Sequence, residues 1–368
     1  MSLAILGLGT AVPRTRLNLS EAIQTATAVC APDDHHARLI KAYFEHTGIQ
    51  GRHTVLAPEV MRDVLERTRH TASNFLPIGC DDDDGPTTAE RMTHYATNAP
   101  PLAIEASQRA LANSGMSASE MTHLVTVSCT GFYAPGLDRD LIVGLGLRGS
   151  VERTHVGFMG CHGSFNGLRV ARAFADSQPT ARVLMCAVEL CSAHYCYGWN
   201  PEQLLSNALF ADGAAAVVAG PESAGDRAPW RLAASGSFLF PDSTDAMTWT
   251  IGNHGFTMTL SSTVPDLLFA HLKPWLSNWL ERQGLTIGDI KSWATHPGGP
   301  RILTFVEAAL GLPAAVHGTS LQVLTDYGNM SSPTVIFVLQ RLQECNAPRP
   351  CVALGFGPGL TAEVMLFV

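Results

Sequence analysis

Charged side chains are scarce in this sequence. Only 15% of its 368 residues are Asp, Glu, Lys or Arg, while 46% are hydrophobic. The 24 basic and 32 acidic residues give a formal net charge of −8. A chain of this composition can bury a large core, so intrinsic disorder is not expected. Because few charges remain to cover a free surface, we expect part of that surface to be buried by oligomerisation.

The sequence also lacks three signals that would point to particular partners. It has no cluster of Lys and Arg, which argues against a nucleic-acid footprint or attraction to an anionic membrane. It has no apolar run near the roughly 18 residues that would cross a bilayer. The apolar start, Met1 to Val12, lacks the basic region and cleavage site of a signal peptide. We therefore expect a soluble cytoplasmic protein with no nucleic-acid partner and no membrane span.

The nine cysteines are neither an even set nor dense enough for a disulfide scaffold. Most lie in apolar stretches, as buried free thiols do. The local group Cys191, His194 and Cys196 has no second pair at zinc spacing, so no metal site is predicted. The remaining question is whether any single cysteine is chemically active.

Strand-like and helix-like segments alternate along most of the chain. The first half has a buried strand at 123–129, a helix at 163–176 and a strand at 181–190. The second half repeats the order with a strand at 292–296, a helix at 300–310 and a strand at 351–355. This alternation predicts an α/β fold of βαβ units, with a mostly parallel sheet covered on both faces.

Two further features concern boundaries. The capping box Thr87 to Glu90 opens a long helix that ends at Gly115, and Pro100-Pro101 is expected to interrupt or kink it. The segment 220–228 is rich in Gly, Pro and charge. It is the best candidate for a boundary between an N-terminal half, residues 1–220, and a C-terminal half, residues 221–368.

Cys161 stands apart from the other cysteines. It follows an apolar strand, is flanked by Gly160 and Gly163, and precedes a helix. A helix N-terminus stabilises a thiolate and lowers the thiol pKa below about 8.5. The glycines would let a substrate carbonyl approach and leave backbone N–H groups free as an oxyanion hole. From this pattern alone, Cys161 can be interpreted either as a nucleophile or as a small core residue.

A thiolate needs a partner for its proton. His296 ends a strand, and the following Pro297 to Pro300 turn is expected to leave its ring exposed at the carboxyl edge of the sheet. His162 adjoins Cys161 and is interpreted as structural. Asn329, before a second helix, offers a neutral amide that can donate to an oxyanion, although an Asn there is usually a cap. The loop-to-helix junctions at Cys161 and at Asn329 lie at equivalent places in the two halves of the chain, as expected for a duplicated fold.

Four motifs occur in order along the chain: Gly160-Cys161 before a helix, His296-Pro297-Gly298-Gly299-Pro300, Tyr327-Gly328-Asn329-Met330-Ser331-Ser332 and Gly355-Phe356-Gly357-Pro358-Gly359. Together they resemble the motif set of type III polyketide synthases, the chalcone-synthase-like members of the thiolase superfamily. The resemblance implies a duplicated, layered αβαβα thiolase-like fold with mostly parallel or mixed sheets. It also implies a homodimer. The resemblance extends over nearly the full length of the chain.

The resemblance also implies roles for individual residues. Cys161 would carry the starter acyl group and the growing chain, while His296 and Asn329 would promote malonyl-CoA decarboxylation and stabilise the enolate. Five positions match the substrate cavity of the family: Cys129, Tyr195, Trp249, Met258 and Ser331. Tyr195 falls near a gatekeeper position that is usually Phe in the family, and Met258 falls at a second gatekeeper position. Only Arg38 and Lys41 match the basic segment that meets the CoA phosphates.

The region Gly85 to Met92, together with Ala99 to Ala103, is similar to bacterial alkylresorcinol and alkylpyrone synthases. It implies a fatty acyl-CoA starter, extended by several malonyl-CoA units and cyclised to a pyrone or a resorcinol, with CoA thioesters as substrates and no cofactor. Two alternatives stay open. One is an initiating ketoacyl synthase that performs a single condensation on acyl carrier protein, and the other is a catalytically silent thiolase-fold binding subunit.

Overall fold

The computed structural model describes residues 2–78, 83–221 and 230–368. Its strands are β1 (Leu3–Ala11), β2 (Thr15–Asn18), β3 (Gly51–Thr54), β4 (His123–Ser128), β5 (Glu152–Gly157), β6 (Val183–Leu190), β7 (Asp212–Pro221), β8 (Trp230–Leu239), β9 (Met247–Gly252), β10 (Gly255–Leu260), β11 (Ser292–Thr295), β12 (Cys351–Gly357) and β13 (Thr361–Phe367). Its α-helices are α1 (Leu19–Cys30), α2 (Asp34–His46), α3 (Pro58–Glu66), α4 (Thr88–Ser114), α5 (Leu137–Leu145), α6 (Gly163–Ser177), α7 (Pro201–Leu209), α8 (Val264–Glu281), α9 (Pro300–Leu310), α10 (Gly318–Tyr327) and α11 (Thr334–Glu344).

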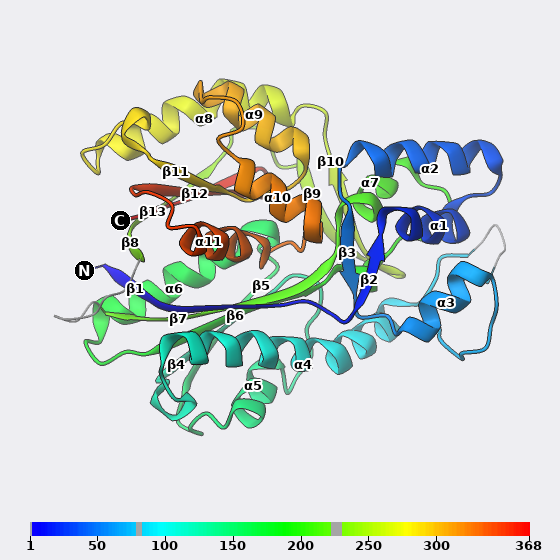
Figure 1. Cartoon of the computed structure of the whole chain (residues 1–368), viewed down its shortest axis with the longest axis horizontal. Helices are drawn as coiled ribbons and strands as arrows, with labels where there is room; N and C mark the ends of the chain where they lie inside the picture. Colours follow the sequence, from blue (N-terminus) through cyan, green and yellow to red (C-terminus); the bar gives the residue numbers. More distant parts are fainter. Residues whose placement is uncertain (1, 79–82, 222–229) are drawn as a thin grey trace.

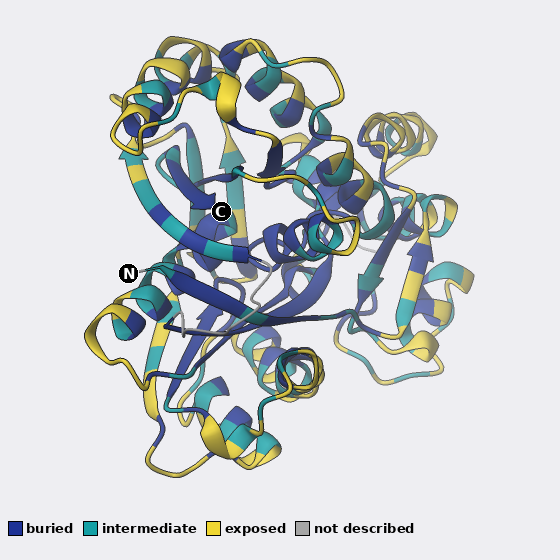
Figure 2. Cartoon of the chain, turned by 60° about the vertical axis from the view of Figure 1, so that its left-hand side comes forward, coloured by how far each residue is buried: buried dark blue, intermediate teal, exposed yellow. Residues whose placement is uncertain are grey.

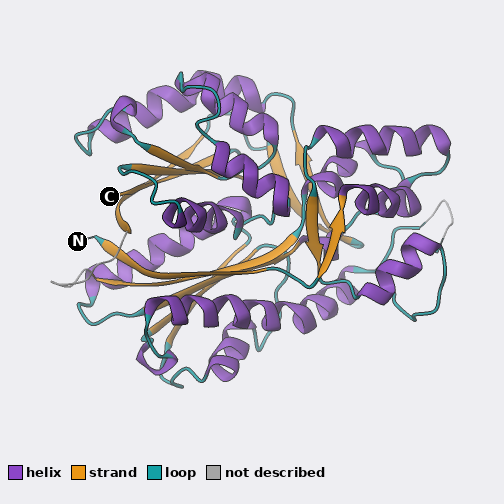
Figure 3. Ribbon diagram, in the orientation of Figure 1, coloured by secondary structure: helices purple, strands orange, loops and turns teal. Residues whose placement is uncertain are grey.

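The chain forms alternating layers of helix and sheet (Figures 1 and 3). Helices α4 and α5 pack with one face of the sheet formed by β1, β4, β6 and β7. Helices α6 and α11 lie in the centre and share a hydrophobic cluster with strands from both halves of the chain. Helices α8 and α9 cover the outer face of β8, β12 and β13. This order confirms the predicted αβαβα layering.

In the described part of the chain, nine strands form one mixed sheet rather than a mostly parallel one. Its strand order is β11-β12-β13-β8-β1-β7-β6-β4-β5. Neighbours are parallel at β11–β12, β4–β5 and β4–β6, and antiparallel at the other pairings. The N- and C-terminal halves are joined by the short antiparallel pairing of β1 with β8, in which Leu3 lies opposite Leu232. Because α6 and α11 fill the space between the two halves of this sheet, its central strands are covered on both faces.

Figure 2 shows how strongly this layering buries the central strands. Every residue of β4, β6, β7 and β12 is buried. Strands covered on both faces are expected to be continuous apolar runs, and β4, β6 and β12 were predicted from this pattern, whereas β7 was not predicted. The edge strand β5 is mostly exposed and alternates instead.

Helix α4 begins and ends where its capping signals predict. Thr87 and Glu90 form both bonds of the capping box, and Gly115 adopts the left-handed conformation at the C-terminal end. The helix continues through Pro100 and Pro101, so the predicted interruption is wrong. Buried residues on both sides of the prolines, Ala99 and Leu102 among them, pack into the core. This packing offsets the hydrogen bonds that the two prolines cannot make.

A smaller group of elements lies beside the end of the layered body (Figure 1). It contains α1, α2, α3 and α7, which share one hydrophobic cluster, and the two short sheets β2–β3 and β9–β10. No helix in the described part of the chain is long and apolar enough to span a membrane. The predicted boundary between the halves adjoins residues 222–229, which lie outside the described residues.

Candidate active site

Cys161 lies in the tight junction between β5 and α6. A single turn of 3-10 helix, Gly160–His162, separates the strand from the helix. Gly160 has a φ of 69°, and a Cβ at this position would lie 2.3 Å from Cδ of Pro358. Only glycine fits this turn, because both its conformation and its neighbour exclude a side chain. The turn places Cys161 on the wall of a pocket.

Asn329 faces Cys161 from the other half of the chain. Its Nδ2 lies 4.0 Å from the Cys161 Sγ and donates to the Gly298 carbonyl at 3.2 Å. Its Oδ1 accepts from the Ser331 backbone N–H at 2.8 Å. These partners fix the orientation of the amide, so that an N–H group points toward the sulfur. The structure thus brings together two residues that lie 168 positions apart.

His296 differs from its expected environment. Its ring was predicted to be exposed, but the residue, which directly follows β11, is only 2% exposed. Its backbone N–H donates to the Leu354 carbonyl at 2.7 Å. Neither ring nitrogen has a hydrogen-bond partner among the described residues. Burial lowers the pKa of His296 to about 3, so the ring is neutral at physiological pH.

Two expectations about Cys161 are corrected. Burial raises its pKa to about 11, although hydrogen bonds from Ser331 and Asn329 act in the opposite direction. The desolvation of a thiolate in this apolar pocket outweighs the helix N-terminus, so the resting group is a thiol. The Gly160 N–H is not free to serve an oxyanion either, because it donates to the Cys129 Sγ at 2.9 Å.

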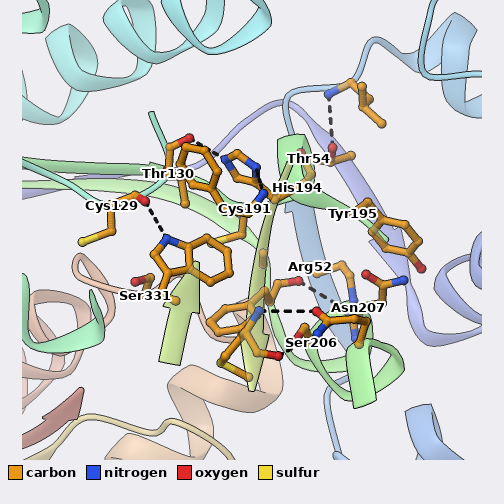
Figure 4. A pocket seen from close by; sticks show the side chains of 18 of the residues that line it. Arg52, Thr54, Cys129, Thr130, Cys191, His194, Tyr195, Ser206, Asn207 and Ser331 are labelled. Atoms are coloured by element: carbon orange, nitrogen blue, oxygen red, sulfur yellow. Dashed lines mark hydrogen bonds between the residues drawn. The ribbon is translucent and has the colours of Figure 1, made fainter. Parts of the chain in front are cut away.

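Four predicted cavity residues line the same pocket as Cys161. Cys129 and Ser331 lie at one end of the pocket (Figure 4), and Trp249 also lines it. The Trp249 Nε1 donates to the Cys129 carbonyl at 2.8 Å. Met258 lies directly opposite Trp249 in the β9–β10 hairpin. The hairpin therefore presents one cross-strand pair, Trp249 and Met258, to the pocket.

Tyr195 also lines the pocket, but away from the end that carries Cys129 and Ser331. Figure 4 places it on the far side from Cys129 and Ser331. Its ring packs with the cluster of α1, α2 and α7. Phe210 is an aromatic residue of the pocket wall whose backbone forms a bridge with Asn329. The sequence analysis did not select Phe210, because it stands in none of the four motifs.

Two polar side chains that the sequence did not single out hold the hairpin in place. The Gln203 side chain donates to the Met258 carbonyl at 2.8 Å and accepts from the Met258 N–H. His194 Nδ1 accepts from the Phe256 N–H at 3.0 Å, and its Nε2 lies 2.6 Å from the Thr130 carbonyl. Since a carbonyl can only accept, Nε2 carries the proton of the neutral ring. Neither residue stands in a motif that would have revealed this function.

Glu189 is a buried carboxylate behind the pocket wall. It accepts from the Cys129 and Thr130 backbone N–H groups, at 2.8 and 3.0 Å, and from the Thr130 and Ser332 hydroxyls. Burial raises its pKa, while these donors oppose the shift. The carboxylate therefore connects the segment that follows β4 to the segment that precedes α11, and so fixes both sides of the Cys161 pocket.

Arg38 and Lys41 lie away from this pocket. Both are exposed on α2, and the Lys41 Nζ lies 3.8 Å from the Glu45 carboxylate. Neither lines the pocket. Within the described residues, no group of three or more His, Cys, Asp or Glu side chains is arranged to hold a metal ion.

Two family models together match nearly the whole chain. The N-terminal domain of chalcone and stilbene synthases matches residues 2–223, and the C-terminal domain of the same enzymes matches residues 231–368. Among curated proteins, the chain is 32% identical to the alpha-pyrone synthesis polyketide synthase-like Pks18 of Mycobacterium tuberculosis, over 98% of this chain and 90% of that one. It is 33% identical to the 1,3,6,8-tetrahydroxynaphthalene synthase of Streptomyces peucetius, over 99% and 92% of the two chains.

A solved structure agrees with these matches. The crystal structure of PKS-I from the brown alga Ectocarpus siliculosus superimposes with a TM-score of 0.91 at 29% identity, over 100% of this chain and 98% of that one. The type III polyketide synthase domain of Steely1 from Dictyostelium gives a TM-score of 0.88 at 26% identity, over 100% and 99%. The chain therefore belongs to the chalcone and stilbene synthase family of type III polyketide synthases.

Proposed function

We propose that Cys161 is the nucleophile of this polyketide synthase and that His296 and Asn329 assist it. The observation that carries this proposal is the position of the Asn329 amide, 4.0 Å from the Cys161 sulfur, with an N–H group aimed at it. The family acts on CoA thioesters and uses no added cofactor. The donors that polarise the substrate must therefore come from side chains such as these.

The first step is acylation. The pKa values of about 11 for Cys161 and about 3 for His296 keep both groups neutral at rest. The thiol proton moves to His296 as the sulfur attacks the starter carbonyl, so no free thiolate accumulates. The bond from the carbonyl carbon to the CoA sulfur then breaks, and the CoA thiolate takes the proton from His296. The products are an acylated Cys161 and free CoA.

The second step is decarboxylative condensation. Malonyl-CoA loses its carboxyl group as CO₂, and the electron pair forms an enolate on the thioester oxygen. N–H groups of Asn329 and neutral His296 stabilise that oxygen. The enolate carbon attacks the acyl carbonyl on Cys161, whose sulfur leaves as the thiolate and takes up a proton from solvent. Transfer of the new β-ketoacyl chain back to Cys161 allows several extensions.

We further propose a fatty acyl starter and cyclisation to a pyrone or a resorcinol. Beyond the residues near Cys161, the pocket is lined by apolar side chains of α1 and α3, among them Val29, Met61 and Val64. A flexible Met258 in the wall suits a long or adaptable chain. The name of the Mycobacterium relative refers to alpha-pyrone synthesis, which is one of the two cyclisation modes.

Three measurements test these assignments. Cys161→Ala is expected to abolish labelling by a radioactive acyl-CoA starter, whereas the matched control Cys345→Ala, at an exposed cysteine, is expected to retain it. Labelled Cys161→Ala protein would refute the nucleophile. His296→Ala is expected to lose malonyl-CoA decarboxylation, and a normal rate would refute its role. Mass analysis of products from a starter panel separates one added two-carbon unit, as an initiating ketoacyl synthase gives, from two or more.

We also propose that Arg38 and Lys41 contact the CoA phosphates. Both are exposed on α2 and so accessible to a bulky anion. Charge reversal, as in Arg38→Glu and Lys41→Glu, is expected to raise KM for acyl-CoA but not for an acyl N-acetylcysteamine thioester, which lacks the phosphates. An equal change for both substrates would contradict a phosphate contact.

The homodimer is likewise a proposal. Exposed large apolar side chains include Phe132, at 54%, and Val143, at 64%, near the start and end of α5. Light scattering after size exclusion is expected to give twice the mass of one chain, and a monomer at micromolar concentration would contradict it. The cytoplasmic location stays a prediction from the sequence.

A further inference from the structure

The backbone that carries the Asn329 amide is bonded to the end of helix α7. The Asn329 N–H donates to the Leu209 carbonyl at 2.9 Å, and the Asn329 carbonyl accepts from the Ala211 N–H at 2.9 Å. Leu209 is the last residue of α7, so these bonds tie Asn329 to the C-terminal end of that helix. A shift of the helix end would therefore move the amide that faces Cys161.

The guanidinium of Arg52, on β3, is bonded to the same helix end. Its Nη1 donates to the Asn207 carbonyl at 2.8 Å and to the Phe210 carbonyl at 3.5 Å, and its Nη2 donates to the Ala208 carbonyl at 2.7 Å. Arg52 and Asn207 lie side by side in Figure 4. Three of four successive carbonyls thus bond Arg52, and the fourth bonds Asn329. The last carbonyls of a helix carry its partial negative charge, which suits a cation.

Arg52 is itself held firmly. It is 6% exposed, and its guanidinium lies 5.0 Å from the centre of the Phe44 ring on α2. Burial lowers the pKa of Arg52 to about 10, which leaves the guanidinium charged at neutral pH. The Gln50 N–H, just before β3, donates to the Thr325 carbonyl of α10 at 2.8 Å. Because α10 ends shortly before Asn329, the start of β3 is bonded to the chain that leads into this residue as well as to α7.

Gly328 brings these segments into close contact. A Cβ at this position would lie 3.2 Å from the Leu209 carbonyl oxygen and 3.8 Å from the Arg52 Cβ. Its φ of 74° also favours glycine. The turn that presents Asn329 therefore packs directly on the end of α7 and on the stem of Arg52.

We propose that Arg52 is a positioning residue for malonyl-CoA decarboxylation, which sets the place of the Asn329 amide relative to Cys161 by bonding the end of α7. This inference rests on the proposed roles of Cys161 and Asn329. An amide that stabilises an enolate must be aimed at the oxygen where charge develops, and a displacement of about 1 Å can cost about 100-fold in rate. Acylation of Cys161, which passes the thiol proton to His296, does not use this amide.

The test compares two reactions of the same protein. Label incorporated at Cys161 from a radioactive acyl-CoA starter measures acylation, and CO₂ released from carboxyl-labelled malonyl-CoA measures decarboxylation. Arg52→Lys keeps the charge, but its compact ammonium cannot span three carbonyls as the planar guanidinium does. The variant is expected to lose decarboxylation about tenfold or more and to keep acylation within about twofold of the wild type. A parallel fall of both rates would overturn the proposal.

A double-mutant cycle shows whether Arg52 acts through Asn329. Asn329→Ala is expected to lower decarboxylation about 100-fold. If Arg52 acts by placing that amide, Arg52→Lys causes no further loss in the Asn329→Ala background. An equal fold loss in both backgrounds, or a normal decarboxylation rate in the Arg52→Lys protein, would overturn the proposal. A normal rate in the Asn329→Ala protein would instead refute the proposed function of that amide.

Arg91→Lys is the matched control. Arg91 is also buried and also donates to backbone carbonyls, but these belong to the segments around Pro86 and Ala193 and not to α7. The control is expected to keep the wild-type ratio of decarboxylation to acylation, and a fall like that of Arg52→Lys would overturn the proposal. If Arg52→Lys does not fold, Phe44→Leu, which removes the ring beside the guanidinium, decides the matter by the same ratio and the same cycle.

Discussion

Acid is expected to destabilise this protein through His194, the imidazole that ties the hairpin to the pocket wall. The ring is buried, with one nitrogen donating to the Thr130 carbonyl and the other accepting from the Phe256 N–H. Burial lowers its pKa to about 3. In the unfolded chain the ordinary value of 6.5 returns, so between these values the unfolded state binds one more proton. Stability is therefore complete above pH 6.5 and is lost as the pH falls toward 3.

The size of the effect follows from those two pKa values. Between pH 7 and pH 5.5, His194 alone lowers the free energy of unfolding by about 1.3 kcal/mol. His296, with the same pKa and burial, contributes a similar amount. Because a protonated His194 can no longer accept from the Phe256 N–H, the same titration weakens the attachment of the hairpin that carries Trp249.

Guanidinium unfolding at the two pH values, at one protein concentration and followed by tryptophan fluorescence, measures this loss. His194→Gln removes the titrating group and is expected to lose about 1.3 kcal/mol less than the wild type between pH 7 and pH 5.5. His254→Gln, at an exposed position on the turn of the same hairpin, serves as the control and is expected to lose as much as the wild type. Equal losses in His194→Gln and the wild type would show that His194 is not held neutral by burial.

Three further outcomes are expected. Gln203→Ala removes the amide that bonds the β10 backbone, and it is expected to cost about 1–3 kcal/mol and to change the order of preference in a starter panel; an unchanged preference would contradict its role in the pocket wall. Gly357→Ala is expected to lower the thermal unfolding temperature strongly, because the new Cβ would lie 2.3 Å from Cδ2 of His162. Gly149→Ala serves as the control and is expected to leave this temperature unchanged, because no atom lies within 4 Å of its new Cβ. Arg91→Met leaves four backbone carbonyls without their buried guanidinium, and it is expected to lower the free energy of unfolding by about 3–5 kcal/mol; a loss below 1 kcal/mol would contradict this.

The sequence identified the elements and the chemistry carried by local motifs. Continuous apolar runs marked the buried strands β4, β6 and β12, and capping residues marked the ends of α4, because both signals depend on near neighbours in the chain. The turns at Gly160-Cys161 and Gly328-Asn329 can likewise be recognised from a few neighbouring residues. Such patterns do not report the direction in which strands pair, so the mixed sheet was not foreseen in detail.

Burial is what the sequence described least well. His296 was expected to be exposed and Cys161 to be a low-pKa thiol, yet one is enclosed and the other has a raised pKa. Both quantities depend on how much water the surrounding elements exclude, and those elements come from remote parts of the chain. The same reason explains why His194, Gln203 and Glu189 were not selected, since each acts on backbone groups far away in sequence.

By itself, then, the sequence selected the residues proposed to do the chemistry, because Cys161, His296 and Asn329 each stand in a short motif with a distinctive turn. Tertiary structure alone decided which of them meet and in what protonation state. Asn329 reaches Cys161 because α6 and α11 lie together in the central layer, and the backbone bridge between Phe210 and Asn329 connects the two halves there. The pKa values of the site follow from that packing, since the cost of a buried charge is set by the whole environment and not by the motif.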